Sequence, residues 1–152
     1  MKQIFLFIFI FLSIAVQAQK EKEDDNKKST SMMPIVSGLY ETVATLEKEG
    51  VRVVRIEFDQ INGKKNTVRK LDGGFTYGLM AYGDYRVKQI AVRVSKKEKN
   101  EWKPLSSGET NGSSAILHLE VNETAEYLIE IEIKEFTEGY SNAHYGLIII
   151  HN

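Results

Sequence analysis

Glu130 and Glu132 have the spacing in this chain that comes closest to a catalytic arrangement. They alternate with apolar residues between Tyr127 and Lys134, so on a strand their side chains would share one face about 7 Å apart. Two carboxyl groups about 5 to 10 Å apart can hydrolyse a glycosidic bond. Alternating glutamates are also an ordinary way to keep a strand's solvent face polar and its edge unpaired. We expect this second role and retain a secreted hydrolase using Glu130 and Glu132 as the alternative.

The histidines are the second group of residues that could carry chemistry. His118, His144 and His151 would have to converge with a carboxylate to hold a transition metal. Their spacing is irregular, and His118 is out of phase with its apolar neighbours Leu117 and Leu119. We therefore expect separate solvent-facing or capping imidazoles. A histidine and carboxylate metal site remains the second form of the hydrolase alternative.

Acids in the predicted loops could instead bind calcium, which takes about six to eight oxygen ligands gathered from close positions. Asp72, Asp84 and Glu109 each lie in a different predicted loop. A calcium site would therefore require three loops to converge at one end of the domain. We expect no bound metal and no cofactor, and these three acids are the weak candidates.

Aromatic residues near predicted loops are the candidates for ligand binding. Exposed rings beside hydroxyl and amide groups let a β-sandwich stack on sugars or contact a protein. Tyr77, Tyr127 and Tyr145 fall on core-facing positions and are assigned to packing. The candidate binding rim consists of the aromatic residues beside Gly or Asp at strand ends, together with the tryptophan: Tyr82, Tyr85, Tyr140 and Trp102.

Composition and motif content remove several other classes of function. The chain has no cysteine, which excludes disulfides, thiolate zinc sites, a cysteine nucleophile and a lipidated cysteine. Its 20 basic and 21 acidic residues give a net charge of -1, so it lacks the basic footprint of a nucleic-acid partner. No G-x-S-x-G, H-E-x-x-H or phosphate-loop string occurs. We expect that the protein is not an enzyme.

The N-terminal segment predicts export. Residues 1–18 combine a positive start, an apolar run from Ile4 to Val16 and a small residue at Ala18, as in a secretory signal peptide. The apolar run is shorter than the roughly 20 residues that a membrane-spanning helix needs. We expect cleavage before Gln19, a periplasmic or extracellular location, and no membrane insertion afterwards. Residues 19–31 contain no apolar side chain, so we interpret them as a disordered spacer.

The rest of the chain predicts one helix followed by strands. Apolar residues recur every three or four positions within 32–50, which indicates a short amphipathic helix. From residue 51 to 152 the period becomes two, with turn signals about every ten residues. Ser106 to Ser113 is a loop by composition. The connections are too short for parallel crossovers, so we predict an all-β fold, an antiparallel jelly-roll-like β-sandwich of seven or eight strands with a short N-terminal helix.

The alternating apolar residues of the three strands predicted around residues 90, 129 and 148 are all expected to point into one core. The run Tyr145 to His151 is almost wholly apolar, which indicates a strand buried on both faces near the centre. The residues expected to be buried together are Ile90, Val92, Val94, Tyr127, Ile129, Ile131, Leu147 and Ile149.

Three strand patterns carry a family resemblance. They are a Y-x-(x)-x-A-x-G-D step at Tyr77 to Asp84, an I-x-V-x-V strand at Ile90 to Val94, and a Y-x-I-x-I strand at Tyr127 to Ile131, close to the family's Y-x-I-x-V pattern. With these patterns the segment from Val68 to Ile150 resembles the bacterial pre-peptidase C-terminal type of jelly-roll domain.

This resemblance implies a non-catalytic module that is appended to secreted proteases or stands alone in exported proteins, connected with calcium or polysaccharide binding. The family's central strand often carries acids, whereas here it offers Lys88 and Arg93, each repelling a nearby cation by roughly 1 kcal/mol or more. We therefore predict an exported binding or accessory module for a carbohydrate or an extracytoplasmic protein.

Overall fold

The computed structural model describes residues 31–109 and 112–152, without the side chain of Glu109. The predicted signal peptide, and the predicted spacer except Ser31, lie outside the described residues. Among those described, no helix is long and apolar enough to cross a membrane. The described elements are α2 (Met33–Lys48), β1 (Arg52–Ile61), β2 (Lys64–Leu71), β3 (Phe75–Gly83), β4 (Val87–Glu98), β5 (Glu101–Glu109), β6 (Ser114–Val121), β7 (Ala125–Phe136) and β8 (Ala143–His151).

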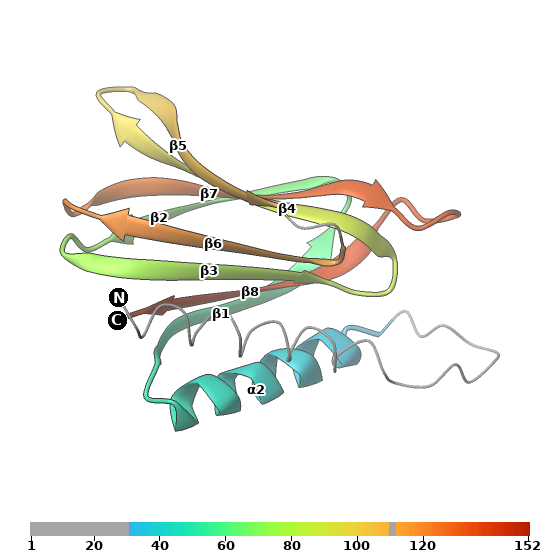
Figure 1. Ribbon diagram of the computed structural model, residues 1–152. Coiled ribbons are helices and arrows are strands. Elements are labelled where there is room, and N and C mark those ends of the chain that lie inside the picture. Colours follow the sequence, from blue (N-terminus) through green and yellow to red (C-terminus); the bar gives the residue numbers. More distant parts are fainter. Residues whose placement is uncertain (1–30, 110–111) are drawn as a thin grey trace. The chain divides into compact units, whose positions relative to one another are not determined.

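The strands form two four-stranded antiparallel sheets packed face to face (Figure 1). The strand order is β1-β8-β3-β6 in one sheet, called sheet A here, and β2-β7-β4-β5 in the other, sheet B. Consecutive strands repeatedly cross from one sheet to the other, which is the jelly-roll arrangement of a β-sandwich. The predicted fold class, including the short N-terminal helix, is confirmed.

Strand β8 lies inside sheet A and is buried on both faces, as its apolar run predicts. Tyr145, Leu147 and Ile149 belong to the core between the two sheets. The opposite face carries Gly146, and α2 packs there. A Cβ atom added to Gly146 would lie 2.5 Å from a methyl carbon of Leu39. The helix therefore covers the outer face of sheet A and approaches it most closely where a side chain is missing.

The core between the sheets has the composition that the alternating patterns predict. All eight residues expected in one interior are buried in a single cluster, including Ile131 from β7 and Val92 from β4. These two residues face each other across the β4 and β7 ladder. The alternation in β7 places Glu126, Glu130 and Glu132 on the other face of sheet B.

The predicted loop at Ser106 to Ser113 is wrong in its first part, because β5 continues through Glu109. Its small residues have a packing role that composition alone does not reveal. A Cβ atom on Gly108 would lie 2.2 Å from the carbonyl oxygen of Ile116 in β6. Gly108 thus lets β5 pass close to β6, where the two sheets meet. Toward its turn, the β4 and β5 hairpin diverges from the sandwich (Figure 1).

We predict that Gly108→Ala lowers the free energy of unfolding by about 1 to 3 kcal/mol, because the new methyl group would meet backbone rather than a movable side chain. Gly112→Ala is the matched control, since a Cβ atom there meets nothing within 4 Å. Its effect should stay within about 0.5 kcal/mol. Denaturant unfolding of both variants tests this, and equal midpoints would show that β5 does not approach β6 as described.

Candidate functional site

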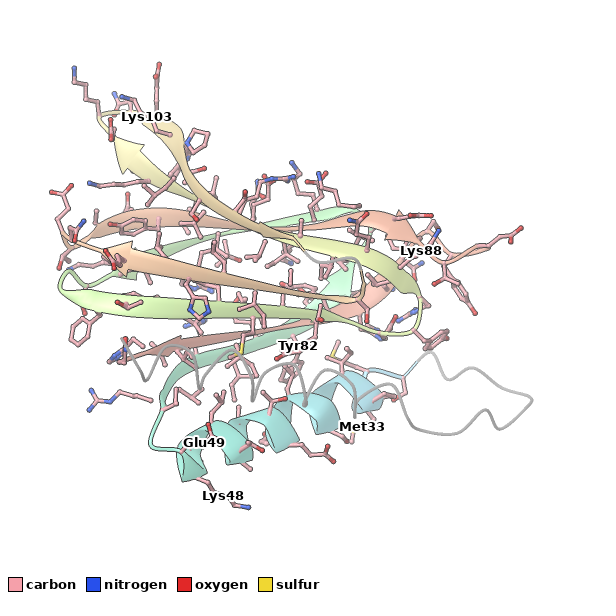
Figure 2. The ribbon with its side chains drawn as sticks, in the orientation of Figure 1. Met33, Lys48, Glu49, Tyr82, Lys88 and Lys103 are labelled. Atoms are coloured by element: carbon pink, nitrogen blue, oxygen red, sulfur yellow. The ribbon has the colours of Figure 1, made fainter. Side chains whose placement is uncertain are left out.

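The four aromatic candidates do not form a single rim. Tyr82 lies between α2 and the strands of sheet A (Figure 2). Burial raises the pKa of Tyr82 to about 12, although a side-chain hydrogen bond with Thr42 acts in the opposite direction. Trp102 lies near the turn between β4 and β5, where the ammonium group of Lys97 is 5.8 Å from its ring centroid. Strand β4 has 12 residues, so this turn lies about 35 Å from Tyr85 at the strand's other end.

Tyr85 and Tyr140 do lie together. Their ring centroids are 5.7 Å apart with an interplanar angle of 85°, an edge-to-face contact. Tyr85 is 39% exposed, whereas Tyr140 is half-buried. Thr137 joins the two loops, because its backbone N–H donates to the Arg86 carbonyl (2.9 Å) and its hydroxyl to the Tyr85 carbonyl (3.0 Å). The aromatic pair is thus fixed between the β3–β4 turn and the β7–β8 loop.

A buried ion pair supports this end of the sandwich. Asp84 and Arg86 are only 8% and 4% exposed. The Arg86 guanidinium donates from Nε to both carboxylate oxygens of Asp84, at 3.1 and 3.0 Å, and lies 5.7 Å from the centroid of the Tyr85 ring. The same carboxylate accepts the backbone N–H groups of Arg86 (2.9 Å) and His144 (3.0 Å).

These contacts determine the protonation states of the cluster. Burial raises the pKa of Asp84, but the hydrogen bonds from Arg86 and from the two backbone N–H groups outweigh it, so the pKa is lowered overall. The Nη2 atom of Arg86 lies 2.8 Å from Nδ1 of His144. Because a guanidinium can only donate, Nδ1 of His144 accepts this hydrogen bond. The cluster is a saturated structural network.

Asp84 and Asp72, two of the three weak calcium candidates, do not converge. Asp84 is committed to Arg86, and Asp72 lies at the opposite end of β3, about 30 Å away across a strand of nine residues. The side chain of Glu109 is outside the described structure. Within the described residues, no group of three His, Asp or Glu side chains could hold a metal ion.

The histidines are also separate. His118 is exposed on β6, and His144 belongs to the buried network. His151 packs against Phe75, with ring centroids 4.6 Å apart, at the far end of β8 from His144. A metal beside His144 would face the Arg86 guanidinium. The alternative of a histidine and carboxylate metal site therefore has no geometric basis in the described residues.

Glu130 and Glu132 are joined by one cation, which the sequence did not indicate. Nη1 of Arg93 lies 3.1 Å from Oε1 of Glu130 and also bonds to Glu132. The hydrogen bond from Arg93 lowers the pKa of Glu132 in spite of partial burial. A glycosidase needs one carboxyl group with a raised pKa as its general acid. This pair instead forms an ion-pair network on the outer face of sheet B, which argues against the hydrolase alternative.

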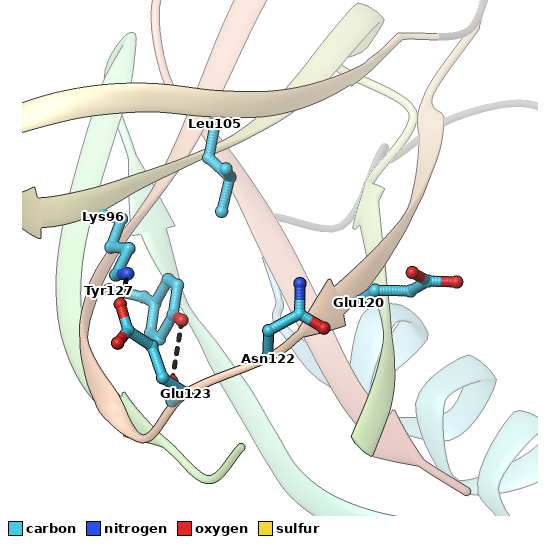
Figure 3. A pocket seen from close by; sticks show the side chains of 6 residues that line it. All are labelled: Lys96, Leu105, Glu120, Asn122, Glu123 and Tyr127. Atoms are coloured by element: carbon cyan, nitrogen blue, oxygen red, sulfur yellow. Dashed lines mark hydrogen bonds and ion pairs between the residues drawn. The ribbon is translucent and has the colours of Figure 1, made fainter. Parts of the chain in front are cut away.

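A groove that the sequence did not predict lies where β5 diverges from β6. It has a volume of about 370 Å³ and is lined by Lys96, Leu105, Glu120, Asn122, Glu123 and Tyr127 (Figure 3). The Tyr127 hydroxyl donates to the Glu123 carbonyl at 3.0 Å, and Lys96 pairs with the Glu123 carboxylate. Leu105 is 48% exposed. The lining residues come from four strands and a turn, so no local motif could reveal them.

Comparisons with known proteins find partly similar solved structures and no relative by sequence. No family model matches the chain, and the search of curated proteins finds no relative. A periplasmic inhibitor of g-type lysozyme from Aeromonas hydrophila is similar over 68% of this chain and 90% of its own, with 10% identity and a TM-score of 0.48. A mitogen derived from Yersinia pseudotuberculosis is similar over 63% and 83%, with 12% identity and a TM-score of 0.48.

A pre-peptidase C-terminal domain is also among the similar structures, as the sequence patterns predict. The domain belongs to a collagenase from Bacillus anthracis and is similar over 62% of this chain and 87% of its own, with 7% identity and a TM-score of 0.48. At this identity the similarity concerns the fold alone.

We predict that Asp84→Asn destabilises the protein by about 3 to 5 kcal/mol, because it leaves the buried Arg86 guanidinium without its counter-charge. The pKa of Asp84 is lowered, so its contribution is complete above the unfolded pKa of 3.8 and is lost as pH falls through the folded value. The difference between wild type and variant should therefore shrink in acid. Asp59→Asn, which breaks an exposed pair with Lys65, should cost at most about 1 kcal/mol. A pH-independent difference in unfolding free energy would contradict this.

We also predict that millimolar calcium leaves the melting temperature unchanged, because the Asp84 carboxylate is occupied by Arg86 and Asp72 lies at the opposite end of β3. Thermal melts with calcium and with a chelator test this. A rise of several degrees that disappears in Asp84→Asn would contradict it.

Proposed function

We propose that the protein is an exported, non-catalytic binding module that recognises carbohydrate at the end carrying Tyr85 and Tyr140. The observation that carries this proposal is one exposed aromatic ring, held edge-to-face by a second ring above a buried ion pair. The C–H faces of sugar rings stack on such aromatic faces, while neighbouring polar groups bond the hydroxyls. The signal-peptide pattern of residues 1–18 supports export.

Polar side chains beside the rings suit this role. The Oδ1 atom of Asn142 accepts a hydrogen bond from Nη1 of Arg86 at 3.3 Å, and Nε2 of Gln60 lies 3.5 Å from the same oxygen. Asn142 is exposed, so its amide nitrogen can donate to a sugar hydroxyl. A site fixed by buried hydrogen bonds loses little freedom when a ligand binds.

The charge network supports a role without catalysis. Asp84, Glu130 and Glu132 are each held by an arginine, and two of them have lowered pKa values. Asp84 and Glu132 are therefore not poised to donate a proton to a leaving group at neutral pH.

We predict that Tyr85→Ala lowers the affinity for a bound polysaccharide about tenfold, the equivalent of about 1.4 kcal/mol of stacking. An array of bacterial and plant polysaccharides identifies the ligand, and affinity electrophoresis measures the loss. Tyr40→Ala is the control, since Tyr40 is 65% exposed on α2. Equal affinities of both variants, or no polysaccharide bound at all, would refute the carbohydrate proposal.

A further inference from the structure

Three of the four edge strands in the described sandwich carry features that block pairing with another chain. Strand β1 has a register shift between Val53 and Arg55. Strand β5 contains Pro104, next to the register shift in its ladder with β4. Bulges, prolines and lysines are the usual protections of an exposed edge. The residues that protect β2 are basic: Lys64, Lys65, Arg69 and Lys70.

Strand β6 is the exception. Its sequence, SAILHLEV, has no proline, lysine, arginine or glycine. It pairs with β3 over eight consecutive positions without a register shift, and it is the last strand of sheet A. Gly108 of β5 covers it near Ile116, but β5 diverges beyond that point. The half of β6 from Leu117 to Val121 therefore has an open edge.

The backbone groups on this open edge can be assigned. The carbonyls of Ser113 and Val121 accept hydrogen bonds from Gly83 N and Gly74 N, on the β3 side. Successive residues of a strand point their N–H and C=O groups to opposite sides. The odd-numbered residues of β6 therefore bond to β3. His118 and Glu120 present their backbone N–H and C=O groups to the open edge.

The groove lies directly beside this edge (Figure 3). A strand added along His118 and Glu120 would continue sheet A. Its side chains on the Leu119 face would point into the groove toward Leu105, and those on the other face would lie beside Glu120. Residues of β6 alternate between buried and exposed along this stretch, so the two faces are already distinct.

We propose that the open edge of β6 binds an extended segment of a partner protein as an added strand, with Lys or Arg beside Glu120 and an apolar side chain over Leu105. Main-chain hydrogen bonds would give such a complex its affinity, and the groove and Glu120 would give specificity. The site is at the opposite end of the sandwich from Tyr85 and does not depend on the carbohydrate proposal.

Charge selects this partner over a second copy of the chain. Glu120 is exposed and has no ion pair within the described residues, whereas Glu123 is already paired with Lys96. Strand β6 of a second copy would bring no Lys or Arg to Glu120. A basic partner segment would instead bring a cation to the Glu120 carboxylate.

Fluorescence anisotropy with a labelled peptide tests the proposal. The probe is Thr-Lys-Val-Lys-Val-Lys-Thr, whose lysines all lie on one face of an extended strand. We expect it to bind the purified protein at least tenfold more tightly than the same peptide with Glu for Lys. Glu120→Lys should reverse that preference, and Glu138→Lys, at the opposite end of the sandwich, should leave it unchanged.

Backbone methylation separates strand addition from charge attraction. One peptide is N-methylated at both valines and another at the two outer lysines. In an extended strand the N–H groups of the valines point to one side and those of the lysines to the other, so only one of these two sets can bond to β6. One methylated peptide should therefore lose binding and the other should keep it. Equal behaviour of the two methylated peptides would refute strand addition. Unchanged preference in Glu120→Lys would refute the charge assignment. A dimer in sedimentation analysis that Glu120→Lys dissociates would show that a second copy occupies the edge.

Discussion

The burial of β8 on both faces is the constraint on which the rest of the structure depends. An apolar strand with isoleucines on each side needs one cover from sheet B and another from elsewhere, and α2 provides the second. Burying each such side chain contributes roughly 1.5 to 3 kcal/mol. Without the helix, Ile148 would face water, and Leu39 would lose its contact with Gly146. The helix is therefore an integral layer of the domain.

Ion pairs join elements at positions where apolar side chains do not hold them together. Between β1 and β2, which connect the two sheets, Nη2 of Arg69 lies 2.7 Å from Oε1 of Glu57. Both residues occupy positions whose ladder neighbours, Tyr127 and Leu147, belong to the core. At the loop end, Asp84 ties two connections together in the same way. The carboxylates of Glu57 and Asp84, which neutralise arginines in this manner, help to hold the fold together.

The sequence was sufficient wherever one strand contained its own pattern. Alternation in β7 and the apolar run of β8 identified the core. In a half-buried strand every second side chain points to the core, so the pattern of apolar residues shows directly which ones are buried. It was insufficient where the environment is tertiary. Nothing local indicates that α2 covers Tyr82, or that Arg93 joins Glu130 to Glu132. The glycine and serines of β5 suggested a loop, because small residues occur both in flexible loops and where two strands approach each other closely. Composition alone does not distinguish these two cases. The sequence listed Tyr85 and Tyr140 among the candidates, but their contact and its support by Asp84 and Arg86 could be known only from the fold.

The pairing of β1 with β8 also has a kinetic consequence. Ile61 finds its ladder partner, Ala143, more than 80 positions later in the sequence. Topologies dominated by such distant contacts close slowly, on a scale of about milliseconds to seconds, because chain entropy is lost before the contacts form. Sheet A cannot be completed until residues 143–151 have left the ribosome and inserted between β1 and β3. Strand β1, although synthesised before the other described strands, therefore has no ladder partner until β8 has emerged.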